Sequence, residues 1–141
     1  MATEVRRVEY FYCNVHDRPG EGARLLSALA DAGVNLLAFN AIPMGLAQTQ
    51  MVLFPEQTDL LVRAAEDEGF DLDGPHAALM IRGDDEIGAL AVLHRRLADT
   101  GINVSASVGV TDGRGGFSAV VYLNAHDADR AEHALRAVAI G

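Results

Sequence analysis

The sequence predicts an α+β fold made of two tandem ferredoxin-like repeats, each an antiparallel sheet with its helices on one face. Three observations lead to this prediction. The chain has 141 residues, of which 50% are hydrophobic and 22% are charged, the balance of a folded protein. A stretch of twenty residues recurs later in the chain at a constant offset. Each copy carries the same order of strand-like and helix-like segments, β-α-β-β-α, with room for a final strand in the first copy.

The repeat is clearest between residues 17–36 and residues 85–104, which align without a gap at an offset of 68. Nine of the twenty aligned positions are identical, a level of self-similarity that indicates a duplicated structural unit. The identical pairs are Asp17/Asp85, Gly20/Gly88, Ala23/Ala91, Leu25/Leu93, Leu29/Leu97, Ala30/Ala98, Asp31/Asp99, Gly33/Gly101 and Asn35/Asn103.

The first copy, residues 1–74, opens with a segment rich in aromatic and β-branched residues, which favour strands. An Asp-Arg-Pro-Gly turn then leads into a segment with leucines at helical spacing, closed by a glycine that suits a helix C-terminus. The predicted elements are a strand at 8–15, a helix from 20 to 33, strands at 35–42 and 48–54, a helix at 59–68 with Thr58 as its N-cap, and a short strand near 70–72.

The second copy, residues 75–141, repeats this order. Its predicted elements are a strand at 77–82, a helix at 88–100 with Leu90, Leu93 and Leu97 facing inward, strands at 103–110 and 117–123, and a last helix capped by Asp127. No clear last strand follows, so we expect this strand to be missing or borrowed from a neighbour. Unprotected sheet edges of this kind also favour a homodimer.

Composition excludes some classes of function. The net charge is −9 and all 11 basic residues are arginine, so a nucleic-acid backbone would be repelled. The longest apolar stretches fall short of the roughly 20 residues that span a bilayer, so we expect no membrane association. The single cysteine, Cys13, cannot form an internal disulfide, and the first residues lack the apolar core of a secretory signal. We therefore expect a cytoplasmic protein.

The turn at residues 14–20 and the helix exit at residues 32–35, Ala-Gly-Val-Asn, together resemble the ACT domain family. The resemblance covers nearly the whole chain as two tandem copies, and residues 85–88 of the second copy are a degenerate version of the turn. It implies a regulatory protein, not an enzyme, that binds an amino acid or a similar small effector between paired domains. It also implies a metabolic enzyme as partner, and no cofactor is expected.

In this family the ligand contacts come from the loop before the first helix and from the asparagine after it. The corresponding residues are His16, Asp17, Arg18, Pro19, Gly20 and Asn35 in the first copy, and Asp84, Asp85, Gly88 and Asn103 in the second. The chemistry of these residues suits an amino acid. Amides at a helix start accept a carboxylate, an aspartate pairs with an ammonium group, and an asparagine offers both a donor and an acceptor.

Simpler interpretations stand beside these assignments. The two aspartates, Asp17 and Asp85, also favour a helix start through its dipole, and the two asparagines also suit turns. His16 also fits a solvated loop, and Cys13 fits a small packed apolar group. The other histidines lack the close pairing of a metal site, so no metal is expected, and no nucleophile–base pair is evident.

Three functions are compatible with the sequence. The first is a sensor that holds an amino acid at the interface between repeats. The alternative is a non-catalytic interaction subunit of a metabolic enzyme, without a ligand of its own, which the degenerate second turn and the missing last strand favour. A small enzyme that uses His16 or Cys13 is a third, weaker interpretation.

Overall fold

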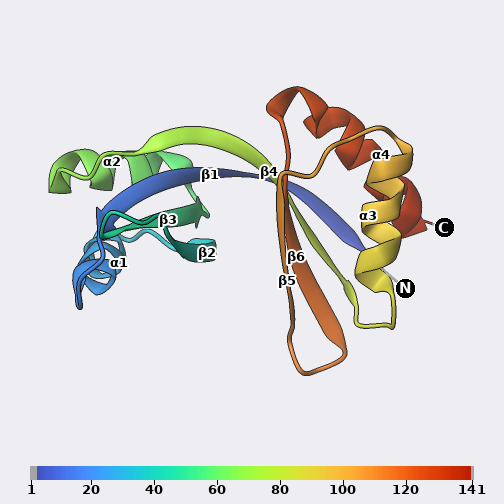
Figure 1. Cartoon of the computed structure of the whole chain (residues 1–141), viewed down its shortest axis with the longest axis horizontal. Coiled ribbons are helices and arrows are strands. Elements are labelled where there is room, and N and C mark those ends of the chain that lie inside the picture. Colours follow the sequence, from blue (N-terminus) through green and yellow to red (C-terminus); the bar gives the residue numbers. More distant parts are fainter. Residues whose placement is uncertain (1–2, 141) are drawn as a thin grey trace. The chain divides into compact units, whose positions relative to one another are not determined.

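The structure, a computed structural model, describes residues 3–140, and the side chains of residues 3–137. It confirms the predicted α+β class, with four α-helices and six strands in these residues (Figure 1). The elements are β1 (Glu4–His16), α1 (Glu21–Asp31), β2 (Leu36–Pro43), β3 (Gln48–Pro55), α2 (Thr58–Glu68), β4 (Asp73–Asp84), α3 (Ala89–Asp99), β5 (Ala106–Thr111), β6 (Gly116–Tyr122), a short 3-10 helix (Ala125–Asp127) and α4 (Ala128–Ile140). The strand order is β2-β3-β1-β4-β6-β5.

The chain divides into two compact units. The first unit is Glu9–His76, and the second unit combines Met1–Val8 with Ala77–Gly141. The division runs through β1 and β4, because each of these long strands contributes one part to each unit. The assignment of residues 1–74 and 75–141 as two ancestral repeats stays a prediction.

The first unit buries one face of its strands under α1 and α2. In the ladders, β3 pairs antiparallel with both β1 and β2. Alternate residues of β1 and β3 point to the helices, as the two-residue period of a strand requires. The buried core consists of Phe11, Cys13, Val15, Leu25, Leu29, Val34, Met51, Leu53, Leu61 and Ala64.

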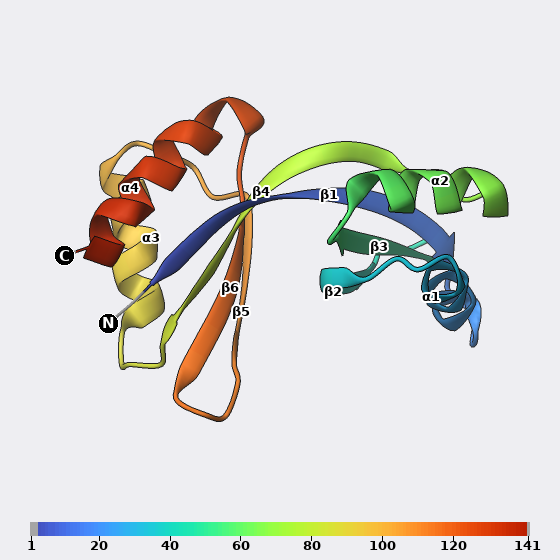
Figure 2. The same cartoon turned by 180° about the vertical axis from the view of Figure 1, so that it is seen from behind.

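The second unit has the same plan, with β6 pairing antiparallel with β4 and β5. Helices α3 and α4 lie side by side on one face of these strands, as the front and rear views agree (Figure 2). The core includes Leu79, Ile81, Leu93, Leu97, Phe117, Ala119, Val121, Ala131 and Leu135. Val5 of β1 belongs to the same core.

The first residues of β1 supply the strand that the second copy lacks in sequence. Residues 4–8 belong to the second unit, and β1 is the neighbour of β4 in the strand order. Two side-chain contacts hold this segment to α4: Arg136 Nη2 donates to the carbonyl oxygen of Val5 over 2.9 Å, and Arg7 Nη2 lies 2.7 Å from Asp129 Oδ1. The missing strand is therefore borrowed from the other end of the same chain.

Three local expectations were wrong. The strand expected near residues 70–72 begins only at Asp73, and it continues without a break into the strand expected at residues 77–82, ending at Asp84. Thr58 is the first residue of α2 and not its N-cap, which is Gln57, and the Thr58 hydroxyl donates to Glu9 Oε1 over 2.8 Å. Leu90 does not face the core, since 42% of it is exposed.

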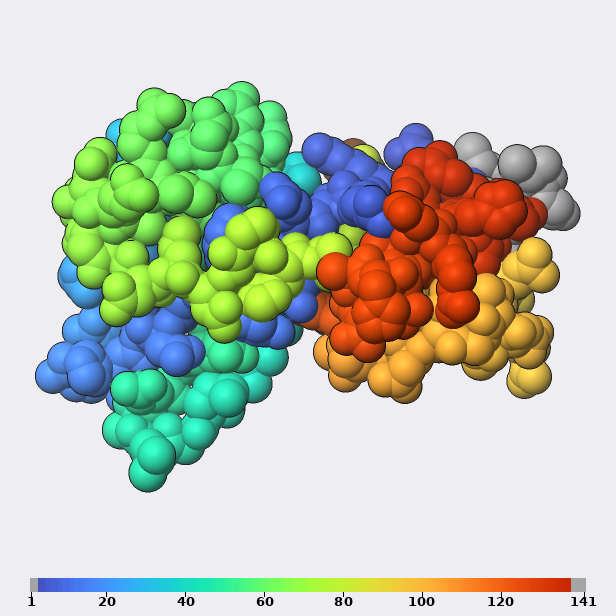
Figure 3. Space-filling model, turned by 90° about the horizontal axis from the view of Figure 1, so that it is seen from above, coloured from blue at the N-terminus to red at the C-terminus, as the bar shows by residue number. Residues whose placement is uncertain are grey.

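The turn between β2 and β3 projects from the first unit as an exposed lobe, teal in the space-filling view (Figure 3). Met44 and Leu46 are its exposed apolar residues. None of the described helices is long and apolar enough to cross a membrane.

Candidate functional site

The loop before α3 ends in a backbone conformation that presents the first amides of the helix. Gly88 is the N-cap residue, with φ 83° in the left-handed region, and no side chain caps the helix. The Ala89 amide donates to the Glu86 carbonyl over 3.1 Å, and the Val92 amide donates to the Gly88 carbonyl over 3.0 Å. The amides of Leu90 and Ala91 occupy first-turn positions, which have no partner within an α-helix.

The loop before α1 in the first unit has the same geometry at an offset of 68. Gly20 is the N-cap residue of α1, with φ 89° and no side-chain cap. The Glu21 amide donates to the Arg18 carbonyl, and the Arg24 amide donates to the Gly20 carbonyl. The predicted residues 17–20 thus form one continuous exposed loop between β1 and α1, and His16 is the exposed last residue of β1.

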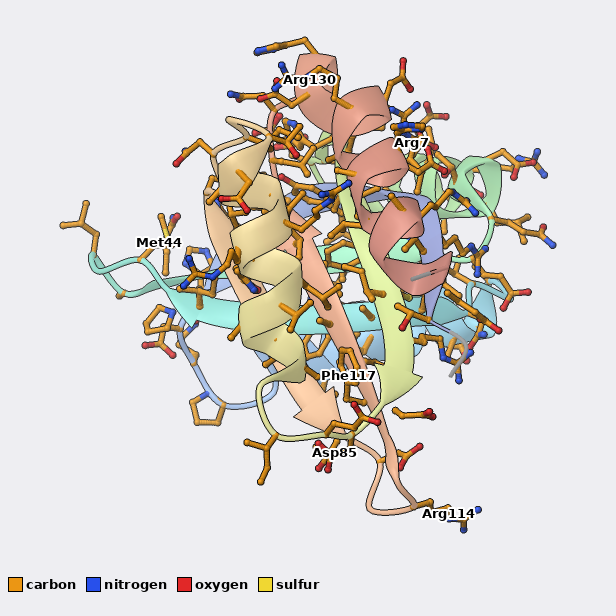
Figure 4. The ribbon with its side chains drawn as sticks, turned by 90° about the vertical axis from the view of Figure 1, so that its right-hand side faces the viewer. Arg7, Met44, Asp85, Arg114, Phe117 and Arg130 are labelled. Carbon is orange, nitrogen blue, oxygen red and sulfur yellow. The ribbon has the colours of Figure 1, made fainter. Side chains whose placement is uncertain are left out.

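In the second unit, two of the predicted residues, Asp85 and Gly88, line a hollow of about 250 Å³, whereas Asp84 is not part of its lining. The loop and the first turn of α3 form one side, and residues of β5 and β6 form the other. The lining residues are Asp85, Glu86, Gly88, Ala89, Leu90, Ala91, Gly109, Val110, Thr111 and Phe117. Figure 4 shows Asp85 and Phe117 close together at this end of α3, with Arg114 further out at the tip of the β5–β6 hairpin.

Leu90 and Gly109 fit each other by size across this hollow. A Cβ added at Gly109 would lie 3.2 Å from Cδ1 of Leu90, which is tighter than ordinary contact. At the equivalent positions in the first unit the sequence has Gly22 and Ala41, so the larger residue lies on the opposite side. On the helix side, the second unit therefore has a leucine side chain where the first unit has a glycine.

The hairpin beside the hollow is held by a carboxylate. Asp112 Oδ1 accepts hydrogen bonds from the Arg114 amide over 2.6 Å and from the Gly116 amide over 3.1 Å. These two backbone bonds lower the pKa of Asp112 below its ordinary value. The Asp85 amide donates to the Gly115 carbonyl over 2.8 Å and so fixes the loop against this hairpin.

The two asparagines lie at the other end of their helices. Asn35 follows the C-terminus of α1, and Asn103 follows that of α3. Each helix has 11 residues, which corresponds to about 16 Å at 1.5 Å per residue. One amino acid therefore cannot reach the loop and the asparagine of the same unit. Asn35 also has a partner within its unit, since its Nδ2 donates to Glu56 Oε2 over 2.7 Å.

The remaining predicted residues are exposed. His16 and Asp84 close their strands opposite Gln48 and Gly116. Arg18 lies 3.4 Å from Glu21 Oε1, and Pro19 lies between this arginine and the N-cap glycine. The structure thus places residues 17–20 in one loop, next to His16, and residues 85–88 in another, next to Asp84.

Cys13 is a packed core residue of the first unit, with 2% of its surface exposed. Burial raises the pKa of its thiol, the nearby Asp71 carboxylate raises it further, and Arg24 opposes them. A thiol in this state is a poor nucleophile, which argues against an enzyme built on Cys13. Among the described residues, no three metal-ligating side chains gather.

Sequence reasoning named Asp85 and Gly88 and missed the other eight lining residues, of which Leu90, Gly109 and Phe117 matter most here. Leu90 was expected in the core, and the other two come from strands about twenty to thirty residues further along the chain. The only available signal was the lone glycine in a strand, a position that often marks a close approach of another group.

Comparison with known proteins gives the fold a context. No family model matches the chain, and no curated protein sequence matches it. Protein BT0572 from Bacteroides thetaiotaomicron has a similar structure, with a TM-score of 0.79 at 16% identity over 94% of this chain and 88% of that one. The ligand-free regulatory subunit of aspartate kinase from Thermus thermophilus matches with 0.71 at 19% identity, over 96% and 95%. The same subunit from Thermus flavus matches with 0.64 at 17% identity, over 100% and 98%. The chain therefore has the fold of these regulatory subunits.

Proposed function

We propose that this chain is a regulatory protein of two tandem ACT-type repeats that binds a small amino acid. The observation that carries the proposal is the hollow of the second unit. It combines carboxylates, first-turn helix amides and apolar side chains within about 250 Å³. Drug-sized ligands occupy roughly 300–1,000 Å³, so this smaller volume suits an amino acid.

Each part of an amino acid has a matching group in the hollow. The first-turn amides of Leu90 and Ala91, at the positive end of α3, suit the ligand carboxylate. Asp85 and Glu86 suit its ammonium group through charge-assisted hydrogen bonds. Phe117 and Val110 give an apolar surface for its side chain.

The loop at residues 16–20 is a second candidate site, because it has the same backbone conformation and hydrogen bonds. If Asn35 and Asn103 contact the ligand, each asparagine must contact a ligand that is bound at the loop of the other repeat or of another copy of the chain. The expectation that the ligand lies where two repeats meet remains part of this proposal.

A regulatory role is supported by the shared fold with the aspartate kinase regulatory subunits. We accordingly propose a metabolic enzyme as partner, a homodimer as the assembly, and the cytoplasm as the location. The alternative, an interaction subunit without a ligand, is favoured by the edge strand β5, whose Val108 and Val110 are exposed.

The experiment is isothermal calorimetry and thermal denaturation with each of the twenty amino acids. An amino acid that binds the native state raises the melting temperature by mass action. Asp85→Asn should weaken the response of that amino acid about tenfold, because it removes one charge-assisted bond. Asp99→Asn, an exposed carboxylate at the far end of α3, is the matched control and should leave the response unchanged.

Absence of heat and of any melting shift with all twenty would reject the sensor and leave the interaction subunit. If Asp17→Asn abolishes the response while Asp85→Asn does not, the ligand binds the first loop and the hollow is not the site.

A further inference from the structure

A groove of about 400 Å³ lies on the helical face of the second unit, away from the hollow. It runs between the end of α3 and the first turns of α4, lined by Arg96, Thr100, Asp129, Arg130, His133 and Ala134. Figure 4 shows Arg130 and Arg7 at the end of the helices opposite to Asp85. The length of α3 thus separates the groove from the proposed amino-acid site.

Backbone contacts hold the two arginines in the groove. Arg96 Nε donates to the carbonyl oxygen of Ala134 on α4 over 3.3 Å, in a half-buried contact. Arg130 Nη2 donates to the carbonyl oxygen of Thr100 over 3.4 Å. Each bond uses one N–H of a guanidinium that has five, so most of the donors remain available for a ligand.

The charge of the groove is positive, although the net charge of the whole chain is −9. Among its lining residues, Arg96 and Arg130 are cations and Asp129 is the single carboxylate. This carboxylate is already neutralised by Arg7, whose Nη2 is 2.7 Å away. Asp127 Oδ1 also lies 3.6 Å from Arg130 Nη2, an ion-pair distance that offsets part of the charge of Arg130. The groove therefore keeps positive charge, chiefly that of Arg96.

We propose that this groove binds a small phosphorylated metabolite. Two guanidinium groups and an imidazole supply more donors than one carboxylate can accept, whereas a phosphate dianion has three terminal oxygens for them. The methyl group of Ala134 and the stems of the arginines provide an apolar surface for an organic body. The volume lies near the lower end of the range of ligand sites, so the ligand is small.

The test is a titration of the full chain, followed by two-dimensional amide NMR, with phenyl phosphate and inorganic phosphate as probes. Sodium chloride at matched ionic strength is the salt control. Both probes should give saturable shifts around residues 96–100 and 129–134, and the ester should bind more tightly. Arg130→Gln should weaken binding about tenfold, while Arg95→Gln, the exposed neighbour on α3, should leave it unchanged.

Arg96→Gln should also weaken phosphate binding about tenfold. If Arg96→Gln fails to fold, Arg96→Lys, which keeps the charge but not the guanidinium donors, takes its place. Equal shifts with chloride, equal weakening by Arg95→Gln, or no saturation by about 10 mM would overturn the proposal. Binding of an acidic peptide but of neither phosphate probe would also overturn it and indicate a protein-docking groove. Asp85→Asn should leave phosphate binding intact, so this result is independent of the amino-acid site.

Discussion

Asn35 and Glu56 exchange two hydrogen bonds that tie the entry of β2 to the exit of β3. The Asn35 Nδ2 donates to Glu56 Oε2 over 2.7 Å, and the Glu56 amide donates to the Asn35 carbonyl over 2.8 Å. The position 68 residues after Glu56 is Asn124, which has no carboxylate. The two predicted asparagines therefore differ in their surroundings, and Asn35 already contributes to the fold.

A double-mutant cycle with Asn35→Ala and Glu56→Ala should measure this contact. We expect a coupling energy of about 0.5–1 kcal/mol from urea denaturation, because a charged acceptor strengthens the bond but exposure weakens it. Asn103→Ala is the control at the equivalent position and should cost less stability. Strict additivity of the two substitutions would contradict the contact.

Gly20→Ala and Gly22→Ala should change stability in opposite directions. Gly20 has φ 89°, and a Cβ there meets no atom within 4 Å, so the cost of about 1 kcal/mol comes from backbone strain alone. Gly22 lies inside α1, where an added Cβ makes ordinary contact with Met51 Cε at 3.5 Å. Alanine should therefore stabilise that position by about 0.5 kcal/mol. Thermal denaturation measures both, and a stabilising Gly20→Ala would refute the conformation of the loop.

Asp112→Asn should show a loss of stability that depends on pH. The pKa of Asp112 is lower in the folded chain than its unfolded value of 3.8, so its ionised form stabilises the fold above that value. This contribution is lost as the pH falls through the folded pKa. The wild type should be more stable than the variant at about pH 7, and the difference should decrease as the pH falls below 3.8.

The measurement for Asp112 is urea denaturation across this pH range. Asp67→Asn, which removes the same charge from an exposed position of α2, corrects for the change in net charge. A difference that persists unchanged to the acid end would mean that the hairpin does not depend on the ionised carboxylate.

Cys13 should react with a thiol reagent only when the first unit opens. Its burial raises the pKa of the thiol and blocks access, so alkylation of the native chain at about pH 8 should be about 100-fold slower or more than in denaturant. Mass spectrometry of the time course gives both rates. Rapid labelling of the native chain would show an accessible thiolate and revive the enzyme interpretation.

The sequence predicted the helices, the turns before them and most strands, because these rest on local periodicity and on glycines near residues 20 and 88. It did not predict the first residues of β1, where the charged residues Glu4, Arg6 and Arg7 interrupt the apolar pattern around the buried Val5 and Val8. It also did not predict the groove, since arginines on helices are normally solvated.

The hollow of the second unit was predictable only in part, because its residues come from segments far apart in the sequence. Its loop carries a local motif, but its opposite wall comes from β5 and β6, and tertiary packing alone brings Phe117 to Asp85. The distance between each loop and its asparagine likewise follows from the length of the helix between them.

The placement of residues 4–8 among the elements of the second unit limits how the chain can be dissected. A fragment that starts after residue 74 would lose Val5 from its core and the arginine that holds Asp129. A fragment that ends at residue 74 would keep residues 4–8 of β1 but lack the elements of the second unit against which they pack. Cutting the gene at its midpoint therefore yields two incomplete domains, whereas moving residues 3–8 behind residue 140 through a designed linker would yield two self-contained ones.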